Sequence, residues 1–331
     1  MQKIFLLLAA IFATSFVYGQ TDSLTREERL ALDSMFKNDE FIKMMQEKKK
    51  SYFDVNIGMG NGTFSLKNNA LNSGQSVTNK IYYSPSVGYY HESGFALTLS
   101  GFIAVDSGKI KMYQYAINPS YTYDKKNINA GISYTRFIEG SSANFDISPF
   151  KNDFYGSFTY KKPWIEPGLA IGYSFGKQIE YYDTSFWFVP PQPLQPRIVH
   201  IRDTITTKLS GLSLSLSATH KWIFYKLINK KDVIELQPSF LLNAGSQQWN
   251  ISHSNSLNNR RPIVQNYLKA RYGDGSASSS FNLQSLAFSA EATYYYRKFY
   301  LLPQFYLDYY LPSTTESRVT ALFSVVTGFY F

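Results

Sequence analysis

The sequence predicts an all-β protein, a transmembrane antiparallel up-and-down β-barrel of about twelve strands that follows a short N-terminal helical extension. Three observations favour this fold. From residue 51 onward, apolar and polar residues alternate with a period of two. Aromatic residues make up 17% of the chain, and they favour strands and the interfaces between water and lipid. After residue 19, the chain has no run of about eighteen apolar residues that could form a membrane helix.

The composition excludes several functional classes. The chain of 331 residues contains no cysteine, which excludes a disulfide framework, a thiolate metal cluster and a cysteine nucleophile. Charged residues make up 17% of the chain, a low share for a soluble enzyme of this length. The hydrophobic share of 44% is also too low for a bundle of membrane helices.

Residues 1–19 are predicted to be a secretory signal peptide. Lys3 supplies a basic start, the apolar run from Phe5 to Val17 is too short to span a bilayer, and cleavage is expected after Gly19. We therefore expect the protein to be exported.

Residues 20–50 are predicted to form a periplasmic amphipathic helical extension. Thr25 and Glu28 have capping-box spacing, and Leu32 and Phe36 recur at a helical interval. Two roles stay open for this segment: a linker on the periplasmic side, or a plug or docking helix. Basic and acidic residues balance in it, so it lacks the positive charge of an arm that binds nucleic acid, and no nucleic acid is expected as a partner.

Residues 51–331 are predicted to form the barrel domain. In the segment 209–219, for example, Leu212, Leu214 and Leu216 alternate with serines, so leucines occupy one face of a strand and hydroxyl groups the other. Such segments have the approximate bounds 51–62, 78–91, 95–106, 109–124, 127–139, 151–162, 167–184, 200–224, 232–249, 281–297, 299–312 and 317–331.

The connections between these segments alternate between short and long. Joints such as 125–126 and 297–298 are tight, whereas connections such as 63–77, 185–199 and 250–280 are long. Short periplasmic turns and long external loops are typical of an outer-membrane barrel. A strand that faces lipid cannot leave its backbone amides unpaired, so the predicted sheet must close on itself.

The end of the chain carries a resemblance to a known class. Apolar residues alternate from Val319 to the final Phe329 and Phe331, and this pattern resembles the terminal-strand assembly signal of Gram-negative outer-membrane barrels. The glutamine after the signal peptide and the tyrosine-rich strands are similar to barrels of the Bacteroidetes group. The resemblance is one of class and covers residues 51–331. It implies location in the cell outer membrane and recognition by the barrel-assembly machinery. One departure is Val326, which stands where a glycine is often found.

The sequence offers little support for an enzyme. The four histidines do not have metal-ligand spacing, and no cofactor, metal or catalytic residue is predicted. Outer-membrane lipases and lipid A deacylases place a histidine and a serine two residues apart on one strand. Ser252, His253 and Ser254 superficially resemble this arrangement, but neighbouring residues of a strand face opposite sides, and the stretch is predicted to lie in a loop.

The phase of the alternation places ionisable and tyrosine side chains on the inner face of the predicted barrel. Two interpretations stay open. If the charges pair within a filled interior, they are structural. If water fills the interior, carboxylates on the wall favour cations or polar solutes, and the tyrosines could stack on a sugar. The lumen-facing candidates are Asp54, Lys80, Lys161, Glu235, Glu291, Asp308, Arg318, Tyr300, Tyr306 and Tyr310.

The long loops are candidates for contacts with partners. Basic residues in the loop 250–280 could meet the phosphates of lipopolysaccharide through charge-assisted hydrogen bonds. These lipopolysaccharide-contact candidates are Arg260, Arg261, Lys269 and Arg271. Other envelope proteins could bind through residues 21–50 or through the long loops, of which 189–196 is stiffened by prolines.

The sequence therefore predicts a non-enzymatic outer-membrane barrel. It acts either as a small-solute channel or as a subunit or scaffold of an envelope complex. The alternative is an outer-membrane hydrolase that modifies lipids, which would use His253 or His91 with a nearby serine.

Overall fold

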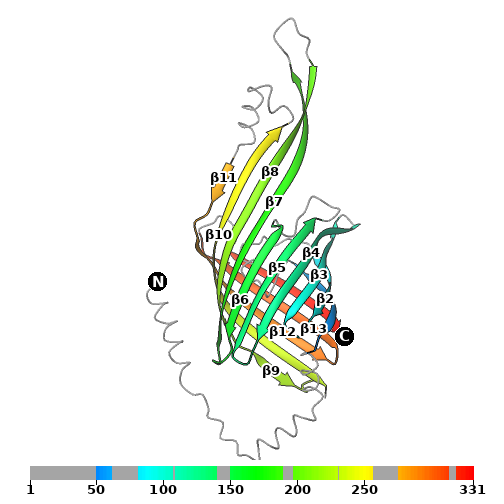
Figure 1. The fold of residues 1–331 in the computed structure, drawn as a ribbon, viewed down its shortest axis with the longest axis vertical. Helices are drawn as coiled ribbons and strands as arrows, with labels where there is room; N and C mark the ends of the chain where they lie inside the picture. Colours follow the sequence, from blue (N-terminus) through cyan, green and yellow to red (C-terminus); the bar gives the residue numbers. More distant parts are fainter. Residues whose placement is uncertain are drawn as a thin grey trace, which may run out of the picture.

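The computed structural model describes residues 50–61, 81–106, 109–139, 150–188, 197–229, 231–255, 275–312 and 318–331, which form a closed antiparallel β-barrel (Figure 1). Its twelve ring strands are β1 (Tyr52–Gly60), β2 (Tyr82–Tyr90), β3 (Phe95–Asp106), β4 (Lys109–Asp124), β5 (Ile128–Glu139), β6 (Asn152–Tyr160), β7 (Glu166–Phe188), β8 (Arg197–Thr219), β10 (Asp232–Asn255), β12 (Asn282–Tyr296), β13 (Phe299–Tyr310) and β14 (Val319–Tyr330). Two short strands, β9 (Trp222–Tyr225) and β11 (Gly275–Ser278), pair with β10.

The ring closes through two contacts between strands that are not joined by a simple hairpin. The first and last strands are neighbours, because β1 pairs with β14 from Asp54↔Tyr330 to Gly60↔Ser324. β8 pairs with β10 along most of its length, which completes the ring. The backbone groups of neighbouring strands therefore satisfy one another around the barrel, as a hydrocarbon environment requires.

The two short strands are continuations of ring strands. β9 follows β8 after a break at His220 and Lys221, and both pair with β10 in the same register. β11 pairs with β10 beyond the end of β12. Each of the twelve predicted strand segments therefore corresponds to a strand of the ring, and the predicted fold class is confirmed.

Prolines within the strands coincide with gaps in the hydrogen-bonded ladders. Pro119 pairs with Leu97 on β3, while the ladder between β4 and β5 passes over Pro119. The other three strand prolines, Pro85, Pro238 and Pro303, show the same pattern. For each of them, the ladder with one neighbouring strand is continuous and the ladder on the other side skips the proline. Because proline has no N–H donor, it fits where one ladder is interrupted. The four residues are Pro85, Pro119, Pro238 and Pro303.

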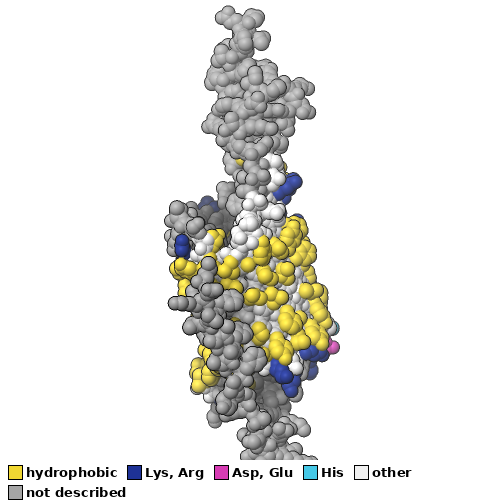
Figure 2. Space-filling view, turned by 90° about the vertical axis from the view of Figure 1, so that its left-hand side faces the viewer, with side chains coloured by type: hydrophobic (Ala, Val, Ile, Leu, Met, Phe, Trp, Pro, Cys, Tyr) yellow, Lys and Arg dark blue, Asp and Glu magenta, His cyan; other side chains and the backbone are white. Residues whose placement is uncertain are grey.

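The side chains along each strand alternate between an apolar outer face and a polar inner face. On β1, Phe53, Val55 and Ile57 are 46–54% exposed on the outer face, whereas Asp54 between them is 7% exposed. Figure 2 shows the outer face as a broad hydrophobic band with Lys and Arg side chains at its upper and lower margins. Among the described residues, no helix is long and apolar enough to cross a bilayer.

Three ring strands are much longer than a membrane requires. β7 and β8 have 23 residues each and β10 has 24, whereas the other ring strands have 9 to 16. A strand of this length extends roughly 75 Å, against a hydrocarbon core of about 30 Å. The three strands rise beyond the rim at the loop end of the barrel as a narrow sheet (Figure 1).

The predicted signal peptide (1–19) and all but the last residue of the predicted helical extension (20–50) lie outside the described residues.

Candidate functional site

Asp54 lies on the inner face at the seam between the first and last strands. It accepts hydrogen bonds from the Tyr300 hydroxyl (3.1 Å) and from the Asn56 amide, and Asn56 accepts one from Ser86 (2.7 Å). Tyr300 belongs to β13, so its hydroxyl passes over β14 to reach β1. The Tyr300 hydroxyl crosses β14 next to Gly328, where an added Cβ atom would lie 2.8 Å from the hydroxyl oxygen. The missing side chain of Gly328 therefore permits a bond across the seam.

Tyrosines gather on the inner face at the turn end of the barrel. The Tyr52 ring stacks on the Tyr90 ring with a centroid distance of 4.8 Å, and it meets the edge of Tyr330 at 6.3 Å. Tyr295 and Tyr300 are 6.4 Å apart. These rings come from five different strands, so they occupy interior space that would otherwise hold water.

A second inner-face network is centred on Asn243 of β10. Its Oδ1 accepts from Ser215 (2.8 Å), and its Nδ2 donates to Ser285 (3.1 Å) and to the Tyr306 hydroxyl (3.2 Å). The Tyr306 hydroxyl donates to Asp308 (3.3 Å). Asn243, Tyr306 and Asp308 are 0–2% exposed. The Tyr306 ring also belongs to a buried apolar cluster with Leu241, Ala287 and Leu322.

The two other candidate carboxylates also have partners. Glu235 forms an ion pair with Lys221 (2.7 Å), and its side chain is 16% exposed. Glu291 accepts from the Thr293 hydroxyl (3.4 Å). The wall carboxylates are thus engaged by neighbouring wall residues.

Other lumen-facing candidates lie at the ends of the barrel. Lys161 follows β6 in the turn to β7 and forms an ion pair with Asp124, the last residue of β4. Arg318 is exposed at the loop end, where its carbonyl accepts from the Tyr310 N–H (2.8 Å). Lys80 lies outside the described residues. Of the ten candidates, the structure brings Asp54 together with Tyr300, and Tyr306 with Asp308.

The histidines do not form a recognisable catalytic arrangement in the described part of the chain. The stretch around His253 was predicted to be a loop, and this is wrong, because β10 continues through it in register with β8. A histidine and a serine on one face of such a strand would have to lie two residues apart. His91 Nδ1 lies 2.8 Å from Ser93 Oγ, but it also accepts from the Ser93 N–H (3.2 Å) within an exposed turn. The described ranges contain no group of three or more His, Cys, Asp or Glu that could hold a metal.

The two terminal phenylalanines extend the seam. Phe329 is 51% exposed on the outer face and packs against Phe299 with a centroid distance of 5.3 Å. Phe331 donates its N–H to the Phe53 carbonyl (2.8 Å) and accepts from the Phe53 N–H (3.1 Å). The lipopolysaccharide-contact candidates Arg260, Arg261, Lys269 and Arg271 lie outside the described residues.

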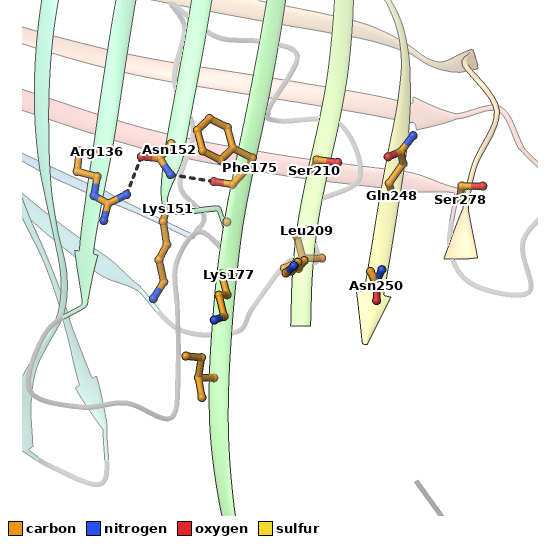
Figure 3. Close-up of a pocket in the computed structure, with 13 residues that line it drawn as sticks. Arg136, Lys151, Asn152, Phe175, Lys177, Leu209, Ser210, Gln248, Asn250 and Ser278 are labelled. Carbon is orange, nitrogen blue, oxygen red and sulfur yellow. Dashed lines mark hydrogen bonds between the residues drawn. The ribbon is translucent and has the colours of Figure 1, made fainter. Parts of the chain in front are cut away.

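Sequence reasoning missed a cluster of basic side chains on the outer face at the loop-end rim. A cavity of about 800 Å³ there is lined by four cations, and none of the described residues that line it is acidic (Figure 3). The cations come from β5, β7, β8 and the residue before β6, far apart in the sequence. The available signal was that Arg136, Lys177 and Lys208 have outward phase on the strands that the sequence predicts. We call this group the rim cation cluster: Arg136, Lys151, Lys177 and Lys208.

The closed ring and its outer face decide the class of the protein. Large apolar side chains such as Ile132, Ile171 and Phe240 are exposed by half or more along the outer face of the ring strands. A soluble protein rarely exposes such a surface, whereas lipid covers it without cost. This protein is an outer-membrane β-barrel.

The sequence matches no protein-family model and no curated protein. Among solved structures, the barrel is similar to the RagAB peptide transporter, with 9% identity over 84% of this chain and a TM-score of 0.33; this chain spans 44% of the transporter chain. It is also similar to LpxR from Salmonella typhimurium, with 7% identity, 84% and 100% of the two chains covered and a TM-score of 0.29. For BamA from Haemophilus ducreyi the identity is 10%, the coverage is 85% and 70%, and the TM-score is 0.26.

Proposed function

We propose that this outer-membrane barrel is a non-enzymatic subunit or scaffold of an envelope complex, with an interior filled by its own wall. The observation that carries the proposal is the burial of the inner face. Buried side chains occur on every ring strand except β5. A water-filled lumen would leave inward side chains exposed, so this burial favours a filled barrel over a channel.

The chemistry of the buried groups supports the same interpretation. A cation-selective wall needs carboxylates that a passing ion can reach. Asp308 instead lies within the Asn243 network, and Asp54 holds the seam through Tyr300. We therefore propose that the lumen-facing candidates are structural residues and that they do not form a solute pathway.

The narrow sheet beyond the rim offers a contact surface for a partner. β6 ends its pairing with β7 at Asn152↔Phe175, while β7 continues to Phe188. Among the described strands, this part of β7 pairs only with β8. An extended strand edge is a ready template for pairing with a strand of another protein. The loop cations Arg260, Arg261, Lys269 and Arg271 and the segment 21–50 stay proposed as additional contacts.

Co-purification from native membranes tests the scaffold proposal. A tagged full-length chain is compared with a variant in which Glu180 is joined to Ile205 through an Asn-Gly turn. These two residues are register partners, so the barrel below the cut keeps its ladder. We expect a stoichiometric partner with the full chain and its loss with the shortened variant.

Folding of the shortened variant is checked by its resistance to heat on a denaturing gel. Absence of any stoichiometric partner of the full chain would contradict the scaffold proposal. A partner that stays bound to the shortened, folded variant would contradict the role of the narrow sheet.

A further inference from the structure

We infer that the rim cation cluster is a binding site for the phosphates of lipid A, the phosphorylated multi-acyl lipid of the outer leaflet. The inference does not depend on the proposed scaffold function. It rests on the register of the strands, on the positioning of Arg136 and on the aromatic surface next to the cations.

Strand register places Arg136, Lys177 and Lys208 in two adjacent rows on the outer face, and Lys151 directly precedes Asn152. One row runs Arg136↔Asn152↔Phe175 across β5, β6 and β7. In the next row, Lys177 of β7 is directly opposite Lys208 of β8. Neighbouring strands are about 4.8 Å apart, so these cations lie close enough to contact one phosphate group or two adjacent ones.

The facing lysines are unfavourable without an anion. Side chains directly opposite in an antiparallel pair have Cβ atoms about 5 Å apart, and like charges there destabilise the sheet. Among the described residues that line the cavity, no acidic side chain offsets Lys177 and Lys208. A bound phosphate turns this repulsion into two charge-assisted hydrogen bonds.

Arg136 is held in place by a buried residue. The Asn152 side chain, in a residue only 9% exposed, accepts from Arg136 Nη1 (2.6 Å) and from the Tyr134 hydroxyl (2.8 Å). Its own amide donates to the Phe175 carbonyl (3.4 Å). Asn152 therefore fixes one edge of the guanidinium group beside the cavity, which lowers the entropy lost when the group binds a ligand.

The surface below the cations suits acyl chains. Phe154 packs against Tyr134 (4.7 Å) and lies 6.3 Å from Phe175, which lies 5.7 Å from Tyr173. Phe154 and Tyr173 are nearly half exposed on the outer face. An amphiphile with a phosphorylated head and several chains can place its head on the cluster and its chains on these rings.

The position of the rim cation cluster along the barrel places it at the outer leaflet of the membrane. The cluster lies at the end opposite the short turns, where β7 and β8 leave the barrel (Figure 3). Short turns are periplasmic in outer-membrane barrels. The phosphates at the cluster therefore belong to a lipid of the outer leaflet, and its characteristic phosphorylated lipid is lipid A.

The test is a titration of the full-length protein in neutral detergent micelles with diphosphoryl lipid A, followed by native mass spectrometry. The test variant is Lys177→Gln/Lys208→Gln, and the control is Lys125→Gln/Lys126→Gln, which removes the same charge from a turn at the opposite end. We expect the Kd to rise at least about tenfold in the test variant and to change less than about twofold in the control.

Two further measurements make the outcome decisive. The unliganded test variant should unfold at the same temperature as the wild type or higher, because a like-charge contact is removed. Inorganic phosphate at the concentration of lipid A should not displace the lipid. Equal Kd values for the wild type and the test variant, an equal loss in the turn control, or displacement by inorganic phosphate would each overturn the inference.

Discussion

Replacing Gly328 with alanine should open the seam between the first and last strands. The new Cβ atom would lie 2.6 Å from Asn56 Cβ, 2.8 Å from the Tyr300 hydroxyl and 2.8 Å from the Val55 carbonyl. The last of these is a backbone atom, so rotating a side chain cannot relieve the overlap. Overpacking typically costs about 1–3 kcal/mol. Loss of the bond from Tyr300 to the Asp54 carboxylate adds about 1.5–3 kcal/mol.

The expected loss in the free energy of unfolding is therefore about 2.5–6 kcal/mol. It is measured by urea titration of the barrel in detergent micelles, with heat resistance on a denaturing gel as a second readout. Gly156→Ala is the matched control. A Cβ atom there would meet no atom closer than 3.5 Å, so we expect a change within about 0.5 kcal/mol.

The variant Tyr300→Phe separates the two causes. It removes the hydroxyl that meets the new methyl group, so Gly328→Ala should cost less in the Tyr300→Phe background than in the wild type. If Gly328→Ala proves as stable as Gly156→Ala, the described seam does not hold the barrel closed. If Gly328→Ala and Tyr300→Phe have additive effects on the free energy of unfolding, the Tyr300 hydroxyl does not pass over Gly328.

Two further predictions concern the interior and the enzymatic alternative. Asn243→Ala should lower the free energy of unfolding by about 2–4 kcal/mol in urea titrations, because buried groups such as Ser215 and Tyr306 lose their hydrogen bond to Asn243. A loss below about 0.5 kcal/mol would contradict the buried network. His91→Ala and His253→Ala should leave the acylation of lipid A and phospholipids unchanged in mass spectra of whole-cell lipids. A change in either lipid class would support the hydrolase.

The strands could be predicted from the sequence because lipid imposes a strict period of two on them. On segments such as 281–297, apolar side chains meet lipid and small polar ones face inward, so the pattern alone gives the fold. Pro119 and the other strand prolines do not end their strands, because each removes only one donor and the ladder resumes beyond it.

The length of β7, β8 and β10 could not be predicted in the same way. Beyond the membrane no hydrocarbon enforces alternation, so the pattern faded before the strands ended. The stretch 250–255 was accordingly assigned to a loop although β10 continues to Asn255.

The specific contacts depend on register, which the sequence does not supply. Nothing local to Tyr300 indicates that it reaches Asp54, since 246 positions separate them and the connection depends on Gly328. The rim cation cluster depends on register in the same way: Lys177 and Lys208 become neighbours only when β7 and β8 pair.

Single-channel recording in a planar bilayer tests the proposed filled interior most directly. It is done on the full chain and on a variant without residues 20–50, so that a plug formed by this segment is tested separately. We predict that neither protein gives stable conductance steps, because side chains of the wall itself occupy the interior. Stable ohmic steps from either protein would contradict it.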